Sequence, residues 1–283
     1  MTCSSHTPVA ISVIIPTYNR AVLVTEAVGS ALAQEGPDVE VIVVDDGSTD
    51  DTGRVLDAFG SRIIRVTQPN LGVSAARNAG ADRASGSHLA FLDADDLWLP
   101  GKLARQAAFF QAHPGARICQ TEEAWLKNGR RINPGKKHRK PSGMIFIPSL
   151  ALCLVSPSAV MIERQFFQQM GGFDESLPAC EDYDLWLRIS CRYPIHLIPE
   201  ALVIKRGGHA DQLSAAPGLD KYRIRCLRKI LETRPLTTAQ RSAVQQTLRE
   251  KCAIYAAGCE KRNRPVEAGY YSWIADTWQP LLP

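Results

Sequence analysis

The sequence lacks the features that mark several large classes of protein. Its longest apolar run, around 150–155, is far shorter than the roughly 20 residues that a transmembrane helix needs. The eight cysteines form no C-x-x-C pair, and no charged segment followed by an apolar one stands at the start. We therefore expect reduced thiols in a cytoplasmic protein, which meets a membrane, if at all, peripherally at its inner face. Internal repeats and low-complexity segments are also absent.

Charge of one sign is not in large excess. The chain has 33 Lys and Arg against 29 Asp and Glu, a formal net charge of +4. This mild positive charge permits anionic substrates or a membrane surface and does not require nucleic acid, so we expect no nucleic-acid partner. With 283 residues, 45% of them hydrophobic, the chain fits one large globular domain with a smaller appendage.

Strands and helices are predicted to alternate through the first hundred residues. Short apolar runs rich in β-branched residues are typical of strands buried on both faces of a parallel sheet. The strands predicted in this way are Val9–Ile15, Val39–Val44, Arg62–Thr67 and His88–Leu92. Between these strands, apolar residues recur at helical spacing, which predicts helices. This alternation with short connections predicts an α/β fold, a twisted and mainly parallel sheet flanked by helices.

Polar residues follow each of these strands and should converge at one edge of the sheet, where such folds bind ligands. The strand ends carry Pro16 to Arg20, Asp45-Asp46, Asn70 and Asp93 to Asp96. Asp93 and Asp95 lie two apart, so both can face the same way, and paired carboxylates suit Mg²⁺ or Mn²⁺. Turn formation and helix capping by Asp45-Asp46 and Asp96 are the alternative at each position.

The second half of the chain is less regular. The region from 111 to 140 shows no clear period, and its basic run at 136–140 is interpreted as a solvated loop. A strand is expected at 159–162, a helix from Glu181, and short strands at 195–198 and 201–204. The sequence pattern changes beyond about Pro217, where helical periodicity predicts a helical extension.

Several segments carry a resemblance to a known family. They are Ser12 to Arg20 (SVIIPTYNR), Val43 to Asp50 (VVDDGSTD), Asn70 to Asn78 (NLGVSAARN), Phe91 to Asp96 (FLDADD), Gly171 to Glu175 (GGFDE) and Glu181 to Trp186 (EDYDLW). In this order they resemble the successive motifs of family 2 glycosyltransferases with the GT-A fold. The match covers roughly residues 9 to 215 and is more specific than any single motif.

The resemblance implies a domain organisation. Residues 1–215 would form a GT-A catalytic domain, a Rossmann-like, mainly parallel sheet flanked by helices. Its nucleotide-sugar half would span about 9–120 and its acceptor half about 121–215. Residues 216–283 would form the C-terminal helical extension.

The resemblance also implies a set of donor-binding residues. Relatives hold the nucleotide base with the loop after the first strand and the second Asp after strand two. Here Tyr18 can stack on a pyrimidine, and Asp46 can accept a hydrogen bond from its ring N–H. The positions that match donor-contacting positions of relatives are Pro16, Thr17, Tyr18, Arg20, Asp46, Asn70, Arg77, Asp93 and Ala94. The resemblance also implies UDP as the nucleotide, because it is the usual one in this family.

A metal site and a general base are implied in the same way. Asp93 and Asp95 match the family's D-x-D element, with Asp95 the direct ligand of Mn²⁺ or Mg²⁺, and His209 matches a third ligand of some relatives. Asp182 matches the general base that takes a proton from the acceptor hydroxyl. From the residues alone, carboxylates at 181 and 182 would equally stabilise a helix N-terminus.

The expected function is an inverting, metal-dependent transferase that moves a hexosyl or N-acetylhexosaminyl group from a nucleotide-diphospho-sugar to a hydroxyl of a glycan, lipid-linked or other acceptor. A non-catalytic domain that binds nucleotide sugar or glycan is the alternative. A dinucleotide-dependent oxidoreductase is disfavoured, because no G-x-G-x-x-G follows the first strand. The basic amphipathic helix at 219–231 would pack on the catalytic domain or contact anionic lipid.

Overall fold

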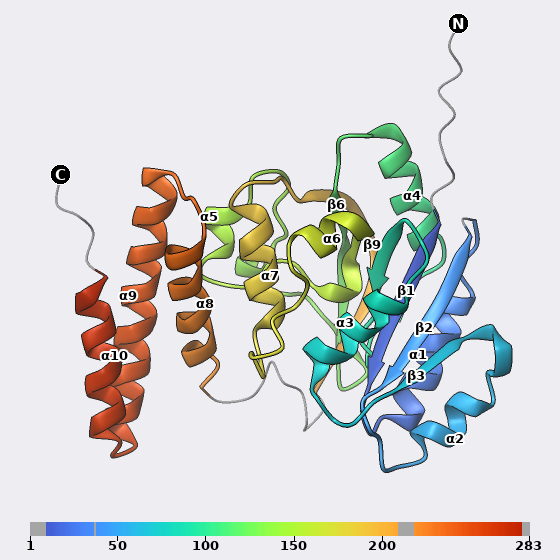
Figure 1. The fold of residues 1–283 in the computed structure, drawn as a ribbon, viewed down its shortest axis with the longest axis horizontal. Coiled ribbons are helices and arrows are strands. Elements are labelled where there is room, and N and C mark those ends of the chain that lie inside the picture. Colours follow the sequence, from blue (N-terminus) through green and yellow to red (C-terminus); the bar gives the residue numbers. More distant parts are fainter. Residues whose placement is uncertain (1–9, 37, 209–217, 279–283) are drawn as a thin grey trace, which may run out of the picture.

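One mixed sheet organises the molecule (Figure 1). The computed structural model describes residues 10–36, 38–208 and 218–278. The strands are β1 Ile11–Thr17, β2 Val39–Asp45, β3 Ile64–Thr67, β4 His88–Phe91, β5 Leu97–Trp98, β6 Ile118–Lys127, β7 Arg130–Ile132, β8 Val160–Glu163 and β9 His196–Gly207. Their order in the sheet is β3-β2-β1-β4-β8-β6-β9-β5, and β7 pairs with β6.

The direction of the strands confirms the predicted α/β fold. β1 is parallel to both β2 and β4, and β2 is parallel to β3. β8 is antiparallel to both β4 and β6, so β6 runs in the same direction as β4, and β9 is parallel to β6. The carboxyl ends of β1, β2, β3, β4, β6 and β9 therefore lie toward one edge of the sheet.

Helices cover both faces of the sheet. Their bounds are α1 Ala21–Leu32, α2 Thr52–Asp57, α3 Val73–Arg83, α4 Lys102–Ala112, α5 Phe146–Ser149, α6 Arg164–Gln169, α7 Glu181–Ser190, α8 Asp220–Thr233, α9 Thr238–Lys261 and α10 Pro265–Thr277. Apolar residues of α1 and α4 bury against one face of β1, and those of α3, α6 and α7 share a core with its other face. This division follows from the alternation of side chains along a strand.

The C-terminal helices have a core of their own. Apolar side chains of α8, α9 and α10 cluster with those of α5 and α7, at the end of the molecule away from β3 (Figure 1). In α8, Ile224, Leu227 and Ile230 are fully buried, so the apolar side of this basic helix packs against protein. α9 begins with a capping box, in which Thr237 and Gln240 satisfy each other's backbone N–H groups.

Several elements differ from expectation, and β5, β7 and α5 were not predicted. β6 occupies a region that we expected to be irregular, the two short strands expected at 195–204 are one strand, β9, and α10 was not predicted individually. β6 carries Glu122 and Glu123 at its centre, which hid it from a search for apolar runs. Lys140 also differs from the solvated loop expected there, because it is buried and pairs with Glu123 at 3.1 Å. In the part of the chain that the structure describes, every helix is too short or too polar to cross a bilayer.

Candidate active site

The loop after β1 is tied to the loop after β2. The side-chain oxygen of Asn19 accepts a hydrogen bond from the backbone N–H of Thr49 at 2.8 Å, and the backbone N–H of Arg20 donates to Thr52 Oγ1 at 3.0 Å. Asn19 itself has a positive φ of 51°, which Asn tolerates better than most residues. These contacts leave Tyr18 on the surface with 43% of its side chain exposed, free to stack on a planar ligand.

Pro16 and Thr17 form the buried end of β1. The Thr17 carbonyl accepts a hydrogen bond from the backbone N–H of Asp46 at 2.9 Å, which holds the ends of β1 and β2 together. Thr17 Oγ1 is buried and has no hydrogen-bond partner among the described residues. Because buried hydroxyls are normally satisfied, this one is available to a polar group bound at the strand ends.

Asp46 organises the loop that follows β3. One carboxylate oxygen accepts from Gln68 Nε2 at 2.7 Å and from the backbone N–H of Leu71 at 2.9 Å, and the other accepts from the N–H of Gly72 at 2.8 Å. Asn70, between these donors, is exposed. A ring N–H of a nucleotide would add to the bonds of Asp46, since each carboxylate oxygen has two acceptor sites.

The loop after β4 presents two carboxylates that are each held by an arginine. Asp93 Oδ1 lies 2.6 Å from Arg77 Nη2, and Asp95 Oδ2 lies 2.7 Å from Arg20 Nη1. Ala94 is buried between them. The second oxygen of each carboxylate, Oδ2 of Asp93 and Oδ1 of Asp95, accepts no hydrogen bond from any described residue. One oxygen on each side of Ala94 is thus left to bind a ligand.

Asp96 differs from its two neighbours because it is buried in the turn. Its carboxylate accepts from Ser158 Oγ at 2.6 Å and from the backbone N–H of Arg206 at 3.0 Å. Burial, reinforced by the negative charges of Asp95 and Asp93, raises the pKa of Asp96 to about 8, although Lys205 opposes the shift. Through its hydrogen bonds to Ser158 and Arg206, Asp96 fixes the turn against β9.

Arg77 joins this loop to α7. It is fully buried in α3, and its Nη1 lies 2.7 Å from Glu181 Oε1 while Nη2 contacts Asp93. Burial alone would lower the pKa of the guanidinium, but the carboxylates of Asp93 and Glu181 more than offset this and raise it. Burial in turn raises the pKa of Glu181, and the charge of Asp182 adds to that rise. Arg77 thus braces the loop after β4 against the helix that carries Asp182.

Asp182 stands apart from the other site carboxylates. It is half-buried in the first turn of α7, where Oδ1 accepts from the N–H of Tyr183 at 2.7 Å. The Cys153 sulfur lies 3.5 Å from Oδ2 and 3.2 Å from the carbonyl oxygen of Val155, so these two acceptors share the single thiol proton. Burial raises the pKa of Cys153 far enough to keep it a protonated donor. No Lys or Arg in the described ranges lies within 4 Å of this carboxylate, so it has no direct ion pair.

Two residues near the site were not predicted from the sequence. Cys153, without a motif around it, was not singled out. Lys205 directly follows a predicted strand and was not singled out. Burial lowers the pKa of Lys205, but the surrounding negative charges more than offset this and raise it. They belong to Glu123, Asp96, Asp93 and Asp182. Its Nζ lies 5.7 Å from the ring of Trp125. A cation therefore sits among the carboxylates without forming an ion pair at contact distance with those described.

The donor set suits a divalent cation only in part. Asp93 and Asp95 each offer a carboxylate oxygen, the ligand that Mg²⁺ and Mn²⁺ prefer, so the two residues fit such an ion. No group of three potential ligands occurs among residues 10–36, 38–208 and 218–278. His209, expected as the third ligand, lies outside the described residues.

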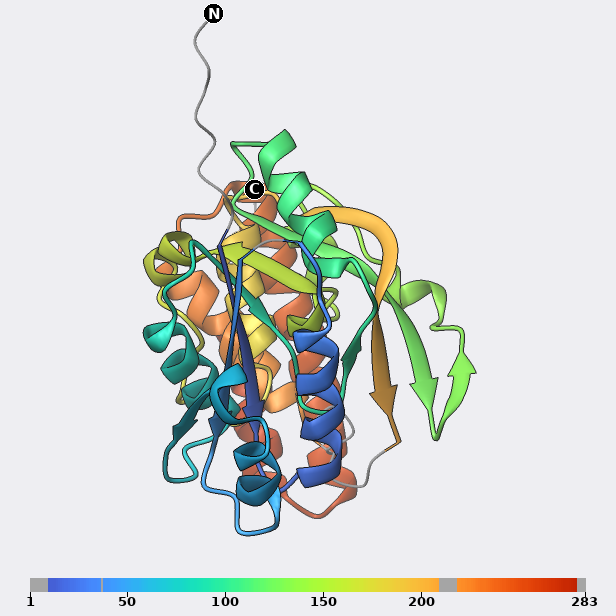
Figure 2. The ribbon, with the colours of Figure 1, turned by 90° about the vertical axis from the view of Figure 1, so that its right-hand side faces the viewer.

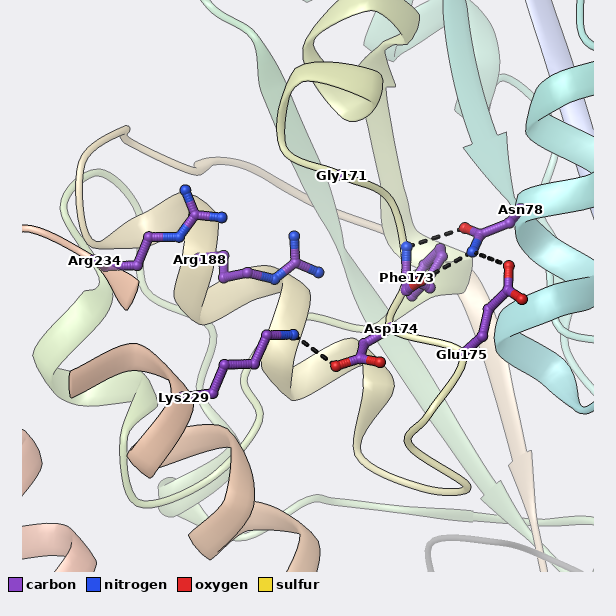
Figure 3. Close-up of a pocket in the computed structure, with 8 residues that line it drawn as sticks. All are labelled: Asn78, Gly171, Phe173, Asp174, Glu175, Arg188, Lys229 and Arg234. Atoms are coloured by element: carbon purple, nitrogen blue, oxygen red, sulfur yellow. Dashed lines mark hydrogen bonds and ion pairs between the residues drawn. The ribbon is translucent and has the colours of Figure 1, made fainter. Parts of the chain in front are cut away.

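The Gly171–Glu175 loop lines a different cleft, of about 430 Å³, between this loop, α7 and α8 (Figure 3). Polar contacts join residues that line it: Lys229 forms an ion pair with Asp174 at 2.7 Å, and Asn78 Nδ2 donates to Glu175 and to the carbonyl of Phe173. Gly172 has a φ of +62°, and a Cβ there would lie 2.8 Å from Asn78 Oδ1. The loop thus fastens α3 and α8 to α7, and Asp93, Asp95 and Asp182 do not line the cleft.

Comparison with known proteins identifies relatives of this fold and sequence. A family model described as "Glycosyl transferase family 2" matches residues 12–171, and a second, "Glycosyltransferase like family 2", matches residues 143–223. An uncharacterized glycosyltransferase of Rickettsia prowazekii is 32% identical over 219 residues, which cover 75% of this chain and 69% of the relative. The chain spans only 34% and 35% of the length of two other relatives, from Rickettsia conorii and Rickettsia felis.

Solved structures share the fold at lower identity. The structure of S. aureus TarS 1-349 in complex with UDP-GlcNAc aligns with a TM-score of 0.73 at 20% identity, covering 93% of this chain and 80% of the TarS 1-349 chain. The mannosyltransferase PcManGT from Pyrobaculum calidifontis, in complex with GDP-Man and Mn²⁺, aligns with a TM-score of 0.60 at 18% identity, covering 97% of this chain and 88% of that one. Both show the same architecture of a curled, mostly parallel sheet flanked by helices.

Proposed function

This chain belongs to glycosyl transferase family 2, and from that premise we propose that it is an inverting transferase with Asp182 as its general base. That it is a glycosyltransferase follows from the family. The mechanism, the metal and the substrates are the proposal. The chain covers only about a third of some relatives, so the proposal concerns the chemistry of these residues and not the activity of a longer protein.

The observation that carries the proposal is the different pairing of the site carboxylates. Asp93 and Asp95 each face an arginine, which holds them in place. Asp182 contacts a backbone N–H and a thiol instead. A general base must be able to take a proton, and a carboxylate locked to a guanidinium is poorly suited to do so. Asp182 is the site carboxylate suited to that role.

On the donor side, the nucleotide would lie over the ends of β1 and β2. Tyr18 would stack on the base, and Asp46 and Asn70 would contact it from the loops that they organise. The unpartnered hydroxyl of Thr17 would accept or donate one further hydrogen bond. TarS in complex with UDP-GlcNAc and PcManGT with GDP-Man support a nucleotide-diphospho-sugar as the donor, and UDP is the nucleotide we propose.

A divalent cation, Mn²⁺ or Mg²⁺, would be held by Asp95 and Asp93 together with ligands from outside the described residues. When bound, it supplies positive charge that stabilises the departing diphosphate. Arg20 and Arg77 keep the two carboxylates oriented for it. The presence of Mn²⁺ with PcManGT supports this proposal.

The residues of the acceptor side then define the chemical step. The acceptor hydroxyl attacks the anomeric carbon from the face opposite the nucleotide, and the glycosidic bond to the diphosphate breaks as the new one forms. Asp182 takes the hydroxyl proton. Cys153 holds one carboxylate oxygen, and the Arg77–Glu181 pair fixes the start of α7, so that the base meets the hydroxyl in a defined direction.

We propose a boundary near residue 216 between the catalytic domain and the helical extension. The sheet and its two faces draw on residues before that point, and α8, α9 and α10 form a separate core with α5 and α7. The extension would thus buttress the acceptor side through α7. The acceptor would be a hydroxyl of a glycan or a lipid-linked glycan.

A panel of nucleotide sugars tests the proposal. We expect UDP-sugars to raise the melting temperature of the chain with Mn²⁺, and EDTA to abolish both this shift and slow hydrolysis of the preferred donor. A non-catalytic binding domain, the second candidate, would show the shift without hydrolysis. If no nucleotide sugar shifted the melting temperature or was hydrolysed, the proposed function would be wrong.

A further inference from the structure

The hairpin formed by β6, β7 and the segment that follows carries a concentration of positive charge. From 124 to 140 the chain has seven Lys or Arg and no Asp or Glu. The cations that are exposed are Lys127, Arg130, Arg131, Lys136, Lys137 and Arg139. None of these six side chains forms an ion pair with a residue in the described ranges, whereas Lys140 is buried against Glu123. Unpaired like charges repel, so such a cluster favours an anionic ligand.

The hairpin stands clear of the helices at one side of the sheet (Figure 2). Among the described strands β7 pairs with β6 alone, so the outer edge of the hairpin is open. Two basic runs that are separate in the sequence, at 127–131 and 136–139, come together here. Their proximity could not be read from the sequence, where the second run alone is typical of a solvated loop.

The base of the hairpin leads directly to the active site. Trp125 of β6 is the register partner of Lys205 in β9, and the next residue of β9, Arg206, donates its backbone N–H to Asp96 at 3.0 Å. Trp125 is half-buried, and its ring packs against His138 at 5.0 Å between centroids and lies 5.7 Å from Lys205 Nζ. A partly exposed aromatic side chain can pack against the C–H groups of a sugar ring.

We propose that this hairpin binds an acidic glycan chain and guides it to Asp182 as the acceptor substrate. Carboxylate or phosphate groups along such a chain would pair with the exposed cations, and a sugar ring would pack on Trp125. The inference rests on the proposed function, because it names the acceptor of that transfer. A lipid surface fits less well, because membrane-binding segments add large apolar groups to their cations and Ile132 is the only exposed large apolar residue among residues 127–139.

The test compares two variants of equal charge. In the hairpin variant, Arg130, Arg131, Lys136 and Lys137 are changed to Gln. In the control variant, four exposed cations elsewhere, Arg83, Arg249, Lys261 and Arg262, are changed to Gln. Binding of polygalacturonate, polyphosphate and neutral dextran is measured at low salt without any donor, so the assay does not depend on transfer.

We expect the unmodified chain to bind at least one acidic polymer and not dextran. The hairpin variant should bind about tenfold more weakly and with a shallower salt dependence, and the control variant within about twofold. Polygalacturonate and polyphosphate distinguish carboxylate from phosphate as the recognised group. The proposal is overturned if no acidic polymer binds, if both variants weaken equally, or if phosphatidylglycerol vesicles bind more tightly than either polymer. Failure of the proposed function would show separately, as absent donor hydrolysis by the unmodified chain.

Discussion

The two sides of the active site treat their carboxylates differently. After β4, Asp93 and Asp95 are each held by an arginine from another element, and each keeps one oxygen without a partner among the described residues. At the start of α7, the partners of Asp182 within the same described ranges are a thiol and a backbone N–H. The first arrangement fixes charge where a metal and a diphosphate would bind. The second leaves a carboxylate able to accept a proton.

A single buried arginine connects the two sides. Arg77 contacts Asp93 on one and Glu181 on the other, and its guanidinium lies 5.0 Å from the ring centre of Phe173. Glu181, not Asp182, makes the ion pair at the start of α7. Glu181 and Asp182 thus have different tasks, positioning and proton transfer. The following changes test whether these tasks are separate.

The largest effect is expected when Asp182 is changed to Asn. The amide keeps the size of the side chain and can still accept one hydrogen bond, but it cannot take the acceptor proton. We expect the transfer rate to fall by roughly 10²- to 10⁴-fold, the usual contribution of a general base. Steady-state transfer assays measure this, and retained transfer would redirect the role to Glu181 or Asp184.

Changing Arg77 to Met should give the largest loss of stability. The substitution leaves Asp93 and Glu181 close together without their cation, and breaking a buried ion pair in this way costs about 3–5 kcal/mol. Urea unfolding measures the free energy. Arg20 to Met is the matched control, because its pair with Asp95 is more exposed and should cost about 1 kcal/mol. Equal losses would show that Arg77 is not the brace described.

Lys102 shows what burial does to a cation that has no carboxylate partner. It is fully buried, donates to Gln106 at 2.7 Å, and burial lowers its pKa to about 7. At Lys102 the unfolded chain binds more protons than the folded chain between pH 7 and about pH 10.5, so this residue makes stability rise with pH there. Asp96, whose pKa is raised to about 8, acts in the opposite direction up to that pH, so the contribution of Lys102, roughly 2 kcal/mol from pH 7 to 9, is measured as a difference between two proteins.

In Lys102→Met that contribution is removed, so the unmodified chain should gain roughly 2 kcal/mol in free energy of unfolding relative to the variant from pH 7 to 9. Urea unfolding at both pH values, in the unmodified chain and the variant, measures it. The same change with pH in both proteins would mean that Lys102 does not titrate as described.

The smallest effect is expected at Cys153. Changing it to Ala removes the thiol that holds one oxygen of Asp182, and a weak hydrogen bond of this kind is worth about 0.5–1 kcal/mol, or a two- to fivefold fall in transfer. The KM for the donor should not change, and Cys153→Ser should restore most of the rate. A loss of donor binding would place Cys153 on the other side of the site.

The parallel sheet and the convergence of polar residues could be predicted because they depend on local patterns. Each strand from β1 to β4 is a short apolar run, and each is followed by its polar residues. β6 could not be predicted in this way, because Glu123 is tolerated only through partners distant in sequence. Burial alone would raise the pKa of Glu123, but Lys140 and Lys205 lower it to about 2, so the strand carries a neutralised charge.

The pairing of the site carboxylates could not be predicted from the sequence either, because it also depends on partners that are distant in the chain. Position placed Asp93 and Asp95 at the edge of the sheet, and the family resemblance added Asp182, but the partner of each is set by tertiary contacts. Arg77 and Glu181 are 104 residues apart, and Cys153 and Asp182 are 29 apart. The motifs identify a small group of candidate site residues. The role of each residue in that group follows from its tertiary contacts.

Donor binding tests this division of tasks most directly. Isothermal titration of the preferred UDP-sugar with Mn²⁺ should give Asp182→Asn the affinity of the unmodified chain within about twofold, because Asp182 acts on the acceptor. Asp95→Ala should bind at least about tenfold more weakly, since it loses a charge-assisted metal contact. If Asp182→Asn lost donor binding while Asp95→Ala kept it, the assignment of the two sides would be wrong.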